Sequence, residues 1–301
     1  MILARRHMGS RGFTLVELLV AMAITGVVIG GIWQVYRAQK RTAASQGQVS
    51  SLQQNLRVAV YQMKRDIRMA GYDPTQSRNF GFTFIGFRDI NDNANVAGNS
   101  ALTITGDDDG DGDPADGDED GVVDATETIS YSLYDHPVGN PDNFTDLARN
   151  AGAGRQLLAE NIAAIGIAYA HDMDDNGQWD TYLDATGTAQ TVWAIDSNND
   201  GLLDRHLDVN LDGVIDELDG PTGGVGTPNE NIAGRALPVT VPASRIRAVR
   251  IWLLAQSRNR DEAYLDLNTY TIGRQIITPR DNLWRRSQEI VIPCENMGLV
   301  P

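Results

Sequence analysis

Hydrophobic residues form one long run near the start of the chain. From Phe13 to Trp33, a stretch of 21 residues, the single charged side chain is Glu17. About 20 apolar residues are enough for a helix to cross a bilayer. A carboxylate inside such a span costs on the order of 3 kcal/mol, so the pattern indicates that Glu17 has a function there.

A second hydrophobic pattern continues the helix beyond this run. Apolar residues recur at intervals of three and four, at Val49, Leu52, Leu56, Ala59, Met63, Ile67 and Ala70. This spacing is typical of one face of an amphipathic helix. Gly71 and Pro74 are typical of a helix end. We therefore predict a helix over residues 13–71, of which 13–33 cross the membrane or form a filament core.

Short runs of β-forming residues follow, bounded by Gly, Asn, Asp and Pro. They are 101–105, 127–134, 162–170, 248–255, 264–272 and 289–292. Residues 157–167 are compatible with a short helix as well as with a strand. An antiparallel sheet packed on the second half of the helix would cover its apolar stripe. The predicted class is α+β, with a β-rich globular domain over residues 72–301.

The residues before the apolar run differ from an ordinary secretory signal, in which a small-residue cleavage site follows the apolar stretch. Here a basic leader with Arg5, Arg6 and Arg11 ends at Gly12, ahead of the apolar stretch. Cleavage after Gly12 would remove the leader, residues 1–12, and keep the helix. The alternative is a simple signal anchor in which Glu17 is tolerated near the interface.

The string GFTLVELLVAMAI, which begins at Gly12, resembles the class III signal of type IV prepilins and type II secretion pseudopilins. The resemblance implies that a prepilin peptidase cleaves the Gly12–Phe13 bond and N-methylates Phe13. It also implies that Glu17 pairs with the terminal amine of a neighbouring subunit during assembly. Such a pair would compensate two buried charges, either of which is costly alone.

Further stretches are similar to PilW-type minor pilins. They are Met63–Pro74 at the helix end and, near the carboxy terminus, Val249–Arg258, Thr269–Gly273, Leu283–Arg286 and Asn296–Leu299. The resemblance implies the type IV pilin fold, a long helix packed on an antiparallel sheet. It also implies a minor pilin that primes or caps type IV pilus assembly, with roles in motility and cell adhesion.

The partners that the resemblance implies are other minor and major pilins, prepilin peptidase, the inner-membrane assembly platform and a tip adhesin. The chain would be a single-pass protein of the bacterial inner membrane, and afterwards part of a pilus at the cell surface. Two alternatives stay open. One is a minor pseudopilin of a type II secretion system, and the other is a calcium-dependent adhesive module displayed at the pilus tip.

The net charge of −15 is concentrated in two segments. Residues 107–127 contain no base, and residues 172–219 contain one, Arg205, whereas the rest of the chain has more bases than acids. Within both segments the acids recur as in a calcium loop, which places oxygen ligands at positions 1, 3, 5, 9 and 12 and Gly at position 6. The alternative is an acidic, solvated and disordered insertion.

We define four loops by this spacing. Loop 1 (116–127) offers Asp116, Asp118, Asp120, Asp124 and Glu127. Loop 2 (172–183) offers Asp172, Asp174, Asn176 and Asp180, and loop 3 (196–207) offers Asp196, Asn198, Asp200 and Asp204. Loop 4 (208–219) offers Asp208, Asn210, Asp212, Asp216 and Asp219. Loops 2 and 3 have Leu183 and Leu207 at position 12, so we predict that they are short of ligands.

The predicted cofactor is calcium, which would fold these insertions. We expect apolar residues to anchor the loops to the core, namely Val123, Trp179, Ile195, Leu203, Val214 and Ile215. The one cysteine, Cys294, excludes an intramolecular disulfide, and we interpret it as a buried structural residue.

Other classes of function find little support in the sequence. The four histidines are scattered, and neither a P-loop nor a G-x-S-x-G motif occurs, so we predict that the chain is not an enzyme. The arginines between Arg245 and Arg286 are interpreted as a solvated strand face, and a nucleic-acid partner is not expected.

Overall fold

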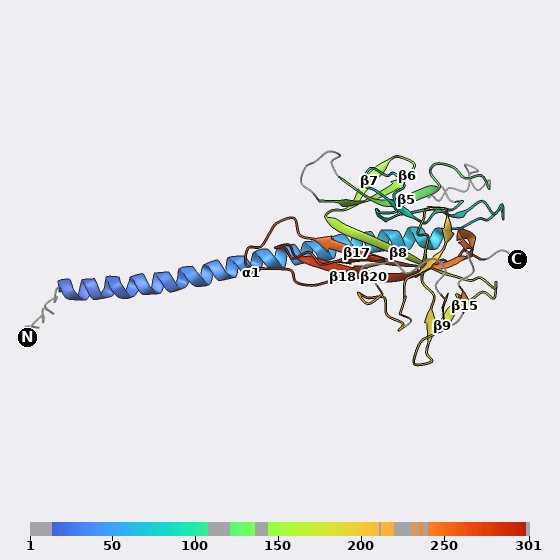
Figure 1. Ribbon diagram of the computed structural model, residues 1–301. Helices are drawn as coiled ribbons and strands as arrows, with labels where there is room; N and C mark the ends of the chain where they lie inside the picture. The colour runs from blue at the N-terminus through green and yellow to red at the C-terminus, as the bar shows by residue number, and fades with distance from the viewer. Residues whose placement is uncertain are drawn as a thin grey trace, which may run out of the picture. The chain divides into compact units, whose positions relative to one another are not determined.

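The computed structural model describes residues 14–107, 121–135, 144–210, 212–219, 231–232, 235–236 and 240–298. It divides into two compact units, Met1–Gln48 and Val49–Pro301. Helix α1 (Leu15–Met69) belongs to both units. Apart from Thr14, it makes up all of the first unit that the structure describes, and its last 21 residues belong to the second unit. Figure 1 shows it as the one long helix of the structure.

The ends of α1 agree with the prediction to within two residues. At its carboxyl end Gly71 has φ +75°, a left-handed conformation that Gly adopts without a steric penalty. The Gly71 N–H then donates to the Thr105 carbonyl at 2.9 Å, which ties the helix end to a strand. The helix therefore ends where the backbone turns and bonds to strand β4 (Leu102–Thr105), which contains Thr105.

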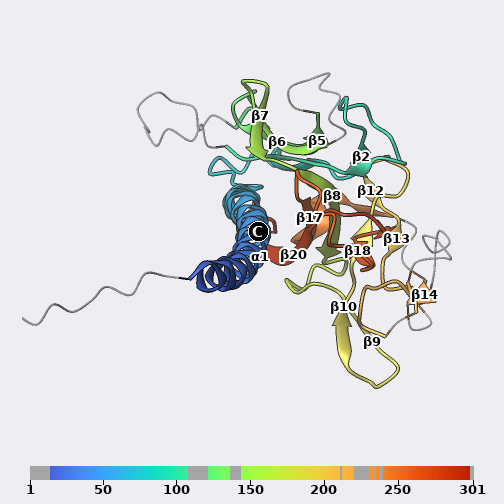
Figure 2. The ribbon, with the colours of Figure 1, turned by 90° about the vertical axis from the view of Figure 1, so that its left-hand side faces the viewer.

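Two five-stranded antiparallel sheets make up most of the second unit (Figure 2). The first has the order β1 (Gly81–Phe84), β4 (Leu102–Thr105), β5 (Thr128–Tyr134), β6 (Asp146–Ala151) and β7 (Arg155–Ala159). The second has the order β13 (Arg205–His206), β11 (Ala194–Ile195), β8 (Ile162–His171), β17 (Ile246–Gln256) and β20 (Arg285–Pro293). All the pairings within both sheets are antiparallel.

Small two-stranded pairs complete the described elements. They are β2 (Phe87–Arg88) with β3 (Asn99–Ser100), β9 (Thr181–Leu183) with β10 (Ala189–Thr191), β12 (Leu202–Leu203) with β16 (Val241–Pro242), β14 (Asn231–Ile232) with β15 (Arg235–Ala236), and β18 (Tyr270–Ile272) with β19 (Gln275–Ile277). A 3-10 turn, η1, covers Ala243–Arg245.

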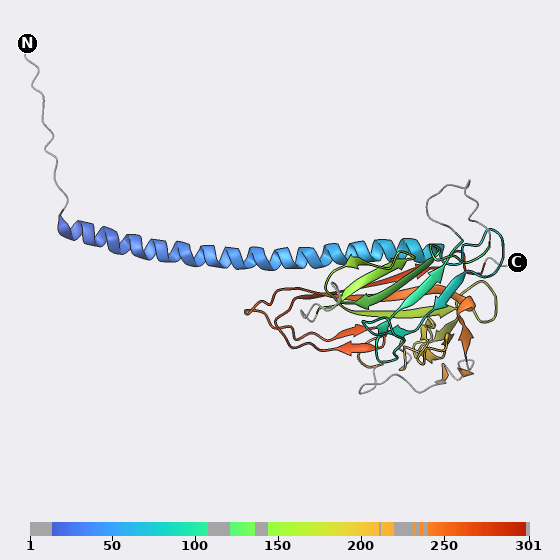
Figure 3. The ribbon, with the colours of Figure 1, turned by 90° about the horizontal axis from the view of Figure 1, so that it is seen from above.

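The main core lies where the second half of α1 meets both sheets. Figure 3 shows strands of the second unit running beside this part of the helix, drawn in light blue. The predicted apolar stripe is buried from Leu52 to Ala70, whereas Val49 is half-buried. It packs against strand residues that include Ile104, Tyr131, Leu147, Ile165, Ile167, Val249 and Ile251. The predicted packing of sheet on helix is thus confirmed.

A second core cluster covers the opposite face of the second sheet. Alternate residues of β8 and β17 point into it, and they include Ala164, Ala168, Ala248 and Trp252. Because both faces of these strands are covered, they are apolar almost throughout. Gly166 lets the β18–β19 hairpin approach this face, since a Cβ there would lie 2.5 Å from the Gly273 nitrogen.

One acid lies inside the main core. Asp66 on α1 is 5% exposed and accepts hydrogen bonds from the Tyr131 hydroxyl at 2.5 Å and from Arg149 Nε at 2.6 Å. Burial, reinforced by the Asp66 charge, raises the pKa of Tyr131, so its hydroxyl stays a donor. The ion pair with Arg149 links α1 to β6, and the hydrogen bond from Tyr131 links α1 to β5.

The structure decides one open alternative and corrects one strand prediction. Residues 157–167, left open between helix and strand, form the end of β7 and the start of β8. Of the strand predicted over 264–272, the structure forms only Tyr270–Ile272. Asp266 interrupts the rest, because its buried carboxylate accepts the Asn268 N–H at 3.1 Å and holds a turn.

Candidate functional site

The start of α1 is closed by reciprocal hydrogen bonds between Thr14 and Glu17. The Thr14 N–H donates to Glu17 Oε2 at 2.9 Å, and the Glu17 N–H donates to Thr14 Oγ1 at 3.2 Å. The Thr14 hydroxyl also donates to Oε2 at 3.0 Å. This is a capping box, a T-x-x-E pattern that satisfies helix N–H groups otherwise left without partners. The pattern is visible in the sequence and was missed.

The predicted cleavage and methylation residues, Gly12 and Phe13, lie outside the described residues. The assembly role of Glu17 therefore stays a prediction. The structure adds that its carboxylate already has a partner within its own chain.

The first part of α1 exposes its apolar side chains on every side. Every large apolar side chain from Leu15 to Tyr36 is more than half exposed within the chain. Among the described helices, α1 is the one that is long and apolar enough to cross a membrane. A surface of this kind needs a lipid or protein environment to cover it.

Three of the four predicted loops share one hydrogen-bond frame. In loops 2, 3 and 4 the carboxylate at position 1 accepts the N–H groups of positions 5 and 6. The position-5 donors, Asn176, Asp200 and Asp212, each lie 3.2 Å from Oδ1 of Asp172, Asp196 and Asp208. The position-6 donors, Gly177, Gly201 and Gly213, lie 2.9, 2.8 and 2.8 Å from Oδ2.

Glycine is required at position 6 of this frame. Gly177, Gly201 and Gly213 have φ values of +79°, +85° and +87°, and Gly121 at position 6 of loop 1 has +81°. Residues with a Cβ rarely adopt this conformation. The sharp turn predicted from D-x-D/N-x-D/N-G is therefore present in loops 2, 3 and 4, and Gly121, the described residue of the loop 1 turn, has the same conformation.

The loops close in two different ways. In loop 4 the carboxylate of Asp219, at position 12, accepts the N–H of Val209 at position 2 at 2.8 Å. In loop 3 the acid at position 9, Asp204, accepts the N–H of Ser197, which is again the residue at position 2, at 2.8 Å. Loop 2 does likewise through Asp180, which accepts the Met173 N–H at 3.3 Å.

This difference changes the interpretation of position 12 in the shorter loops. In loops 2 and 3, where Leu183 and Leu207 occupy position 12, the position-9 acids close the loop instead. Leu207 is buried in the second core cluster, and Leu183 belongs to β9. Spacing alone did not separate a nine-residue loop from a twelve-residue loop that lacks its last ligand.

The carboxylates at the base of the loops are buried. Asp172, Asp196 and Asp208 are exposed by 1, 1 and 2%. Burial, opposed in part by hydrogen bonds from backbone N–H groups such as that of Gly213, raises the pKa of Asp208 to about 6, and the Asp219 and Asp212 charges add to the rise. A cation held between these carboxylates would offset both the cost of burying their charges and the repulsion between them.

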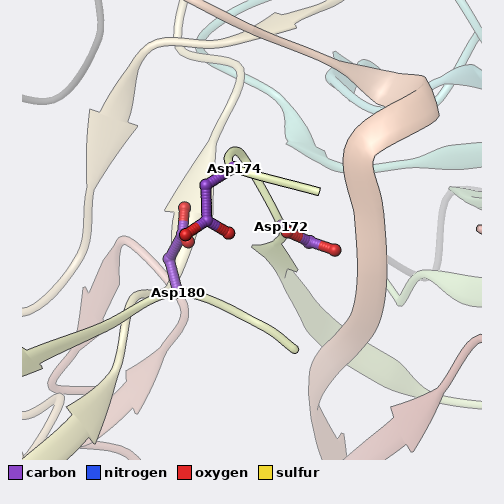
Figure 4. A group of neighbouring side chains, drawn as sticks. All are labelled: Asp172, Asp174 and Asp180. Carbon is purple, nitrogen blue, oxygen red and sulfur yellow. The ribbon is translucent and has the colours of Figure 1, made fainter. Parts of the chain in front are cut away.

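Loop 2 brings three acids to one point. Asp172, Asp174 and Asp180 each offer a carboxylate oxygen, and these oxygens lie within 4.8 Å of one another (Figure 4). Two nitrogen-bearing side chains lie beside them: Arg247 Nε lies 3.7 Å from Asp172, and His171 Nε2 lies 3.3 Å from Asp180. Burial lowers the pKa of His171 to about 4, so this ring is neutral at pH 7.

Loop 1 is described only in part. Asp116, Asp118 and Asp120 lie outside the described residues. Among those described, the Asp124 N–H donates to Glu127 Oε2 at 2.7 Å. The equivalent bond in loop 4 joins the Asp216 N–H to Asp219 Oδ2 at 2.8 Å. Loop 1 therefore ends in the same way as the twelve-residue loop 4.

Three of the predicted apolar anchors, Ile195, Leu203 and Ile215, are correct, and the other three are wrong. Ile195 and Leu203 are buried, and Ile215 packs against the second core cluster. Trp179, Val214 and Val123 are exposed, by 36, 55 and 38%. Val214 follows Gly213 at position 7 and faces away from the core. Trp179 leads into the β9–β10 hairpin, in which Tyr182 is the buried residue, packed edge-on against His206.

Several late arginines form ion pairs, one of them between neighbouring strands of the second sheet. Arg250 pairs with Glu289 at 2.6 Å, and Arg285 pairs with Asp281 at 2.6 Å. Arg245 and Arg247 pair with acids of loop 2. Cys294 is buried, as predicted, and burial raises the pKa of its thiol to about 12.

Comparisons with known proteins identify the amino-terminal region. The model of the prokaryotic N-terminal methylation motif matches residues 7–33. No curated protein matches the chain. Among solved structures, a type IV-like pilin from Thermus thermophilus is similar, with 13% identity and a TM-score of 0.38, over 82% of this chain and 98% of that one.

The methylation motif runs directly into the apolar part of α1, which fits anchoring in a membrane before assembly. After α1 come the antiparallel sheets of an α+β fold. The chain thus has the prokaryotic N-terminal methylation motif at residues 7–33, in which the helix able to cross a membrane begins, and an α+β fold.

Proposed function

We propose that the chain is a minor pilin that primes or caps the assembly of a type IV pilus. The observation that supports this most is the methylation motif over residues 7–33, joined without a break to a helix that is apolar on all sides. In this proposal prepilin peptidase cleaves before Phe13 and methylates it. The inner membrane then holds the subunit until the assembly platform inserts it beside other minor and major pilins, below any tip adhesin.

A minor pseudopilin of a type II secretion system is the alternative, since it would share the leader and the helix. Deletion of the gene separates the two. We expect loss or strong reduction of surface filaments, counted by electron microscopy, with secretion of extracellular enzymes unchanged and filaments restored by the wild-type gene. Normal filaments together with enzymes retained inside the cell would contradict the pilus assignment.

Calcium is the second part of the proposal. Loops 2, 3 and 4 repeat one frame in which oxygen-bearing side chains surround a Gly turn. In the described part of loop 1, Gly121 has the same positive φ, and the Asp124 N–H donates to Glu127. Hard oxygen donors without cysteine ligands suit calcium more than zinc or copper. The base carboxylates are buried, so an ion bound there would stabilise the exported domain, which has no disulfide to do so.

Loop 4 is the strongest candidate for a complete site. It has acids at positions 1, 5, 9 and 12 and an amide at position 3, and Ile215 at position 8 fixes it to the core. Loops 2 and 3 have one acid fewer after the Gly turn. We therefore expect loop 4 to bind calcium more tightly than they do.

A further inference from the structure

The part of α1 that follows the apolar run carries aromatic and basic residues on one face. Trp33, Tyr36, Arg37, Lys40 and Arg41 are spaced i, i+3, i+4, i+7 and i+8, which places them along one side of the helix. The rings of Trp33 and Tyr36 stack with centroids 5.9 Å apart. All five side chains are exposed.

The three bases have no acid on their own helix nearby. Between Glu17 and Asp66 the sequence contains no Asp or Glu. No acid of this stretch of α1 therefore pairs with these charges, which leaves them free to attract an anionic partner.

The distance from the start of α1 sets the depth of this face in a membrane. Leu15 to Trp33 span about 28 Å, close to the hydrocarbon thickness of about 30 Å. Arg37 and Lys40 then lie about 6 and 10 Å beyond Trp33 along the axis. Because Cβ atoms tilt toward the amino end of a helix, these long side chains reach back toward the bilayer.

We propose that this face, Trp33 to Arg41, binds anionic phospholipid headgroups in the leaflet at the carboxyl end of the apolar segment. The two rings would lie at the level of the headgroups, where amphipathic aromatic residues are favoured. The three cations would contact lipid phosphates. The face would hold the helix at a fixed depth before assembly, so the inference rests on the membrane anchoring within the proposed function.

The test measures lipid preference with the full-length protein in a neutral detergent. Delipidated protein is mixed with equal amounts of phosphatidylglycerol, which is anionic, and phosphatidylcholine, which is not, and bound lipids are counted by native mass spectrometry. We expect the wild type to prefer phosphatidylglycerol by about tenfold or more, since each nearby base adds attraction to an anionic surface.

Two triple variants separate this face from general positive charge. Arg37→Gln, Lys40→Gln, Arg41→Gln is expected to abolish the preference. The matched control, Arg57→Gln, Lys64→Gln, Arg65→Gln, removes two arginines and one lysine from exposed positions farther along α1 and should retain it. The charge-conserving pair Arg37→Lys, Arg41→Lys should also retain it, which shows that the segment still folds.

Three results would overturn the inference: no preference in the wild type, an unchanged preference in the first triple variant, or an equal loss in the control. Glu17→Gln is included in the same assay and should keep the preference. Failure of lipid binding is therefore distinguishable from failure of the assembly role, which is measured separately in cells.

Discussion

At the residue scale, Glu17 has two possible partners that the structure helps to separate. Its carboxylate accepts hydrogen bonds from the Thr14 N–H and hydroxyl, at 2.9 and 3.0 Å. A negative charge in the first turn also suits the positive end of the helix dipole. The local cap thus accounts for an acid at this position, but a neutral glutamine would supply much of the same bonding. The charge itself is what pairing with a neighbour's amine requires.

We therefore predict different outcomes for Glu17→Gln and Thr14→Ala. Glu17→Gln keeps a hydrogen-bond acceptor but removes the charge, so membrane insertion stays intact and incorporation into filaments falls at least tenfold. Thr14→Ala removes the capping hydroxyl, which costs about 1 kcal/mol of helix stability, and keeps the charge. Incorporation should then remain near the wild-type level. Immunoblots of sheared filaments and of membranes measure both quantities.

The pairing role is contradicted if Glu17→Gln enters filaments as well as the wild type. If Thr14→Ala fails as completely as Glu17→Gln, the cap and not the charge is what assembly needs.

At the element scale, the loops show how one motif gives two closed forms. The frame from position 1 to position 6 is the same in loops 2, 3 and 4, because it depends on one carboxylate and one Gly turn. The closing acid lies at position 9 in loops 2 and 3 and at position 12 in loop 4. The frame is thus determined by residues within six positions of one another. Which acid closes the loop depends on where the next strand begins.

Removal of calcium is predicted to destabilise the domain through these loops. For one site held at 100 times its Kd, bound calcium adds about 2.7 kcal/mol, which corresponds to roughly 5–10 °C in Tm for a domain of this size. We expect a chelator to lower the Tm of the full-length protein by at least this amount and to expose residues 172–219 to protease.

Asp208→Asn is expected to remove part of the response to chelator, since it weakens loop 4. Asp92→Asn serves as the matched control, because Asp92 lies outside the loops at φ +70°, which asparagine tolerates. An unchanged Tm and unchanged cleavage after chelation would argue against calcium in the loops.

At the scale of the whole molecule, the sequence predicted the helix and the fold class well. The 3–4 spacing from Leu52 to Ala70 depends on one face of one helix, and that face is buried as expected. Strong β runs such as β8 and β17 were also found, since both of their faces are covered and they are apolar throughout.

Two strands of the first sheet were not predicted, and the reason is physical. Strands β6 (Asp146–Ala151) and β7 (Arg155–Ala159) contain polar residues such as Asn150 and Gln156, so they lack a clear two-residue alternation. They are strands because β5 pairs with β6 and β6 with β7. Such pairing depends on backbone hydrogen bonds between strands, which leave no two-residue period of apolar side chains in the sequence. The capping box, by contrast, was present in the sequence as T-x-x-E and could have been found.

The proposed function requires that this chain is processed and becomes a subunit of a filament. The most direct measurement is mass spectrometry of its amino terminus in filaments sheared from cells. We predict a chain that begins at N-methylated Phe13, with residues 1–12 absent. A chain that keeps its leader, or that is absent from filaments while abundant in membranes, would contradict it.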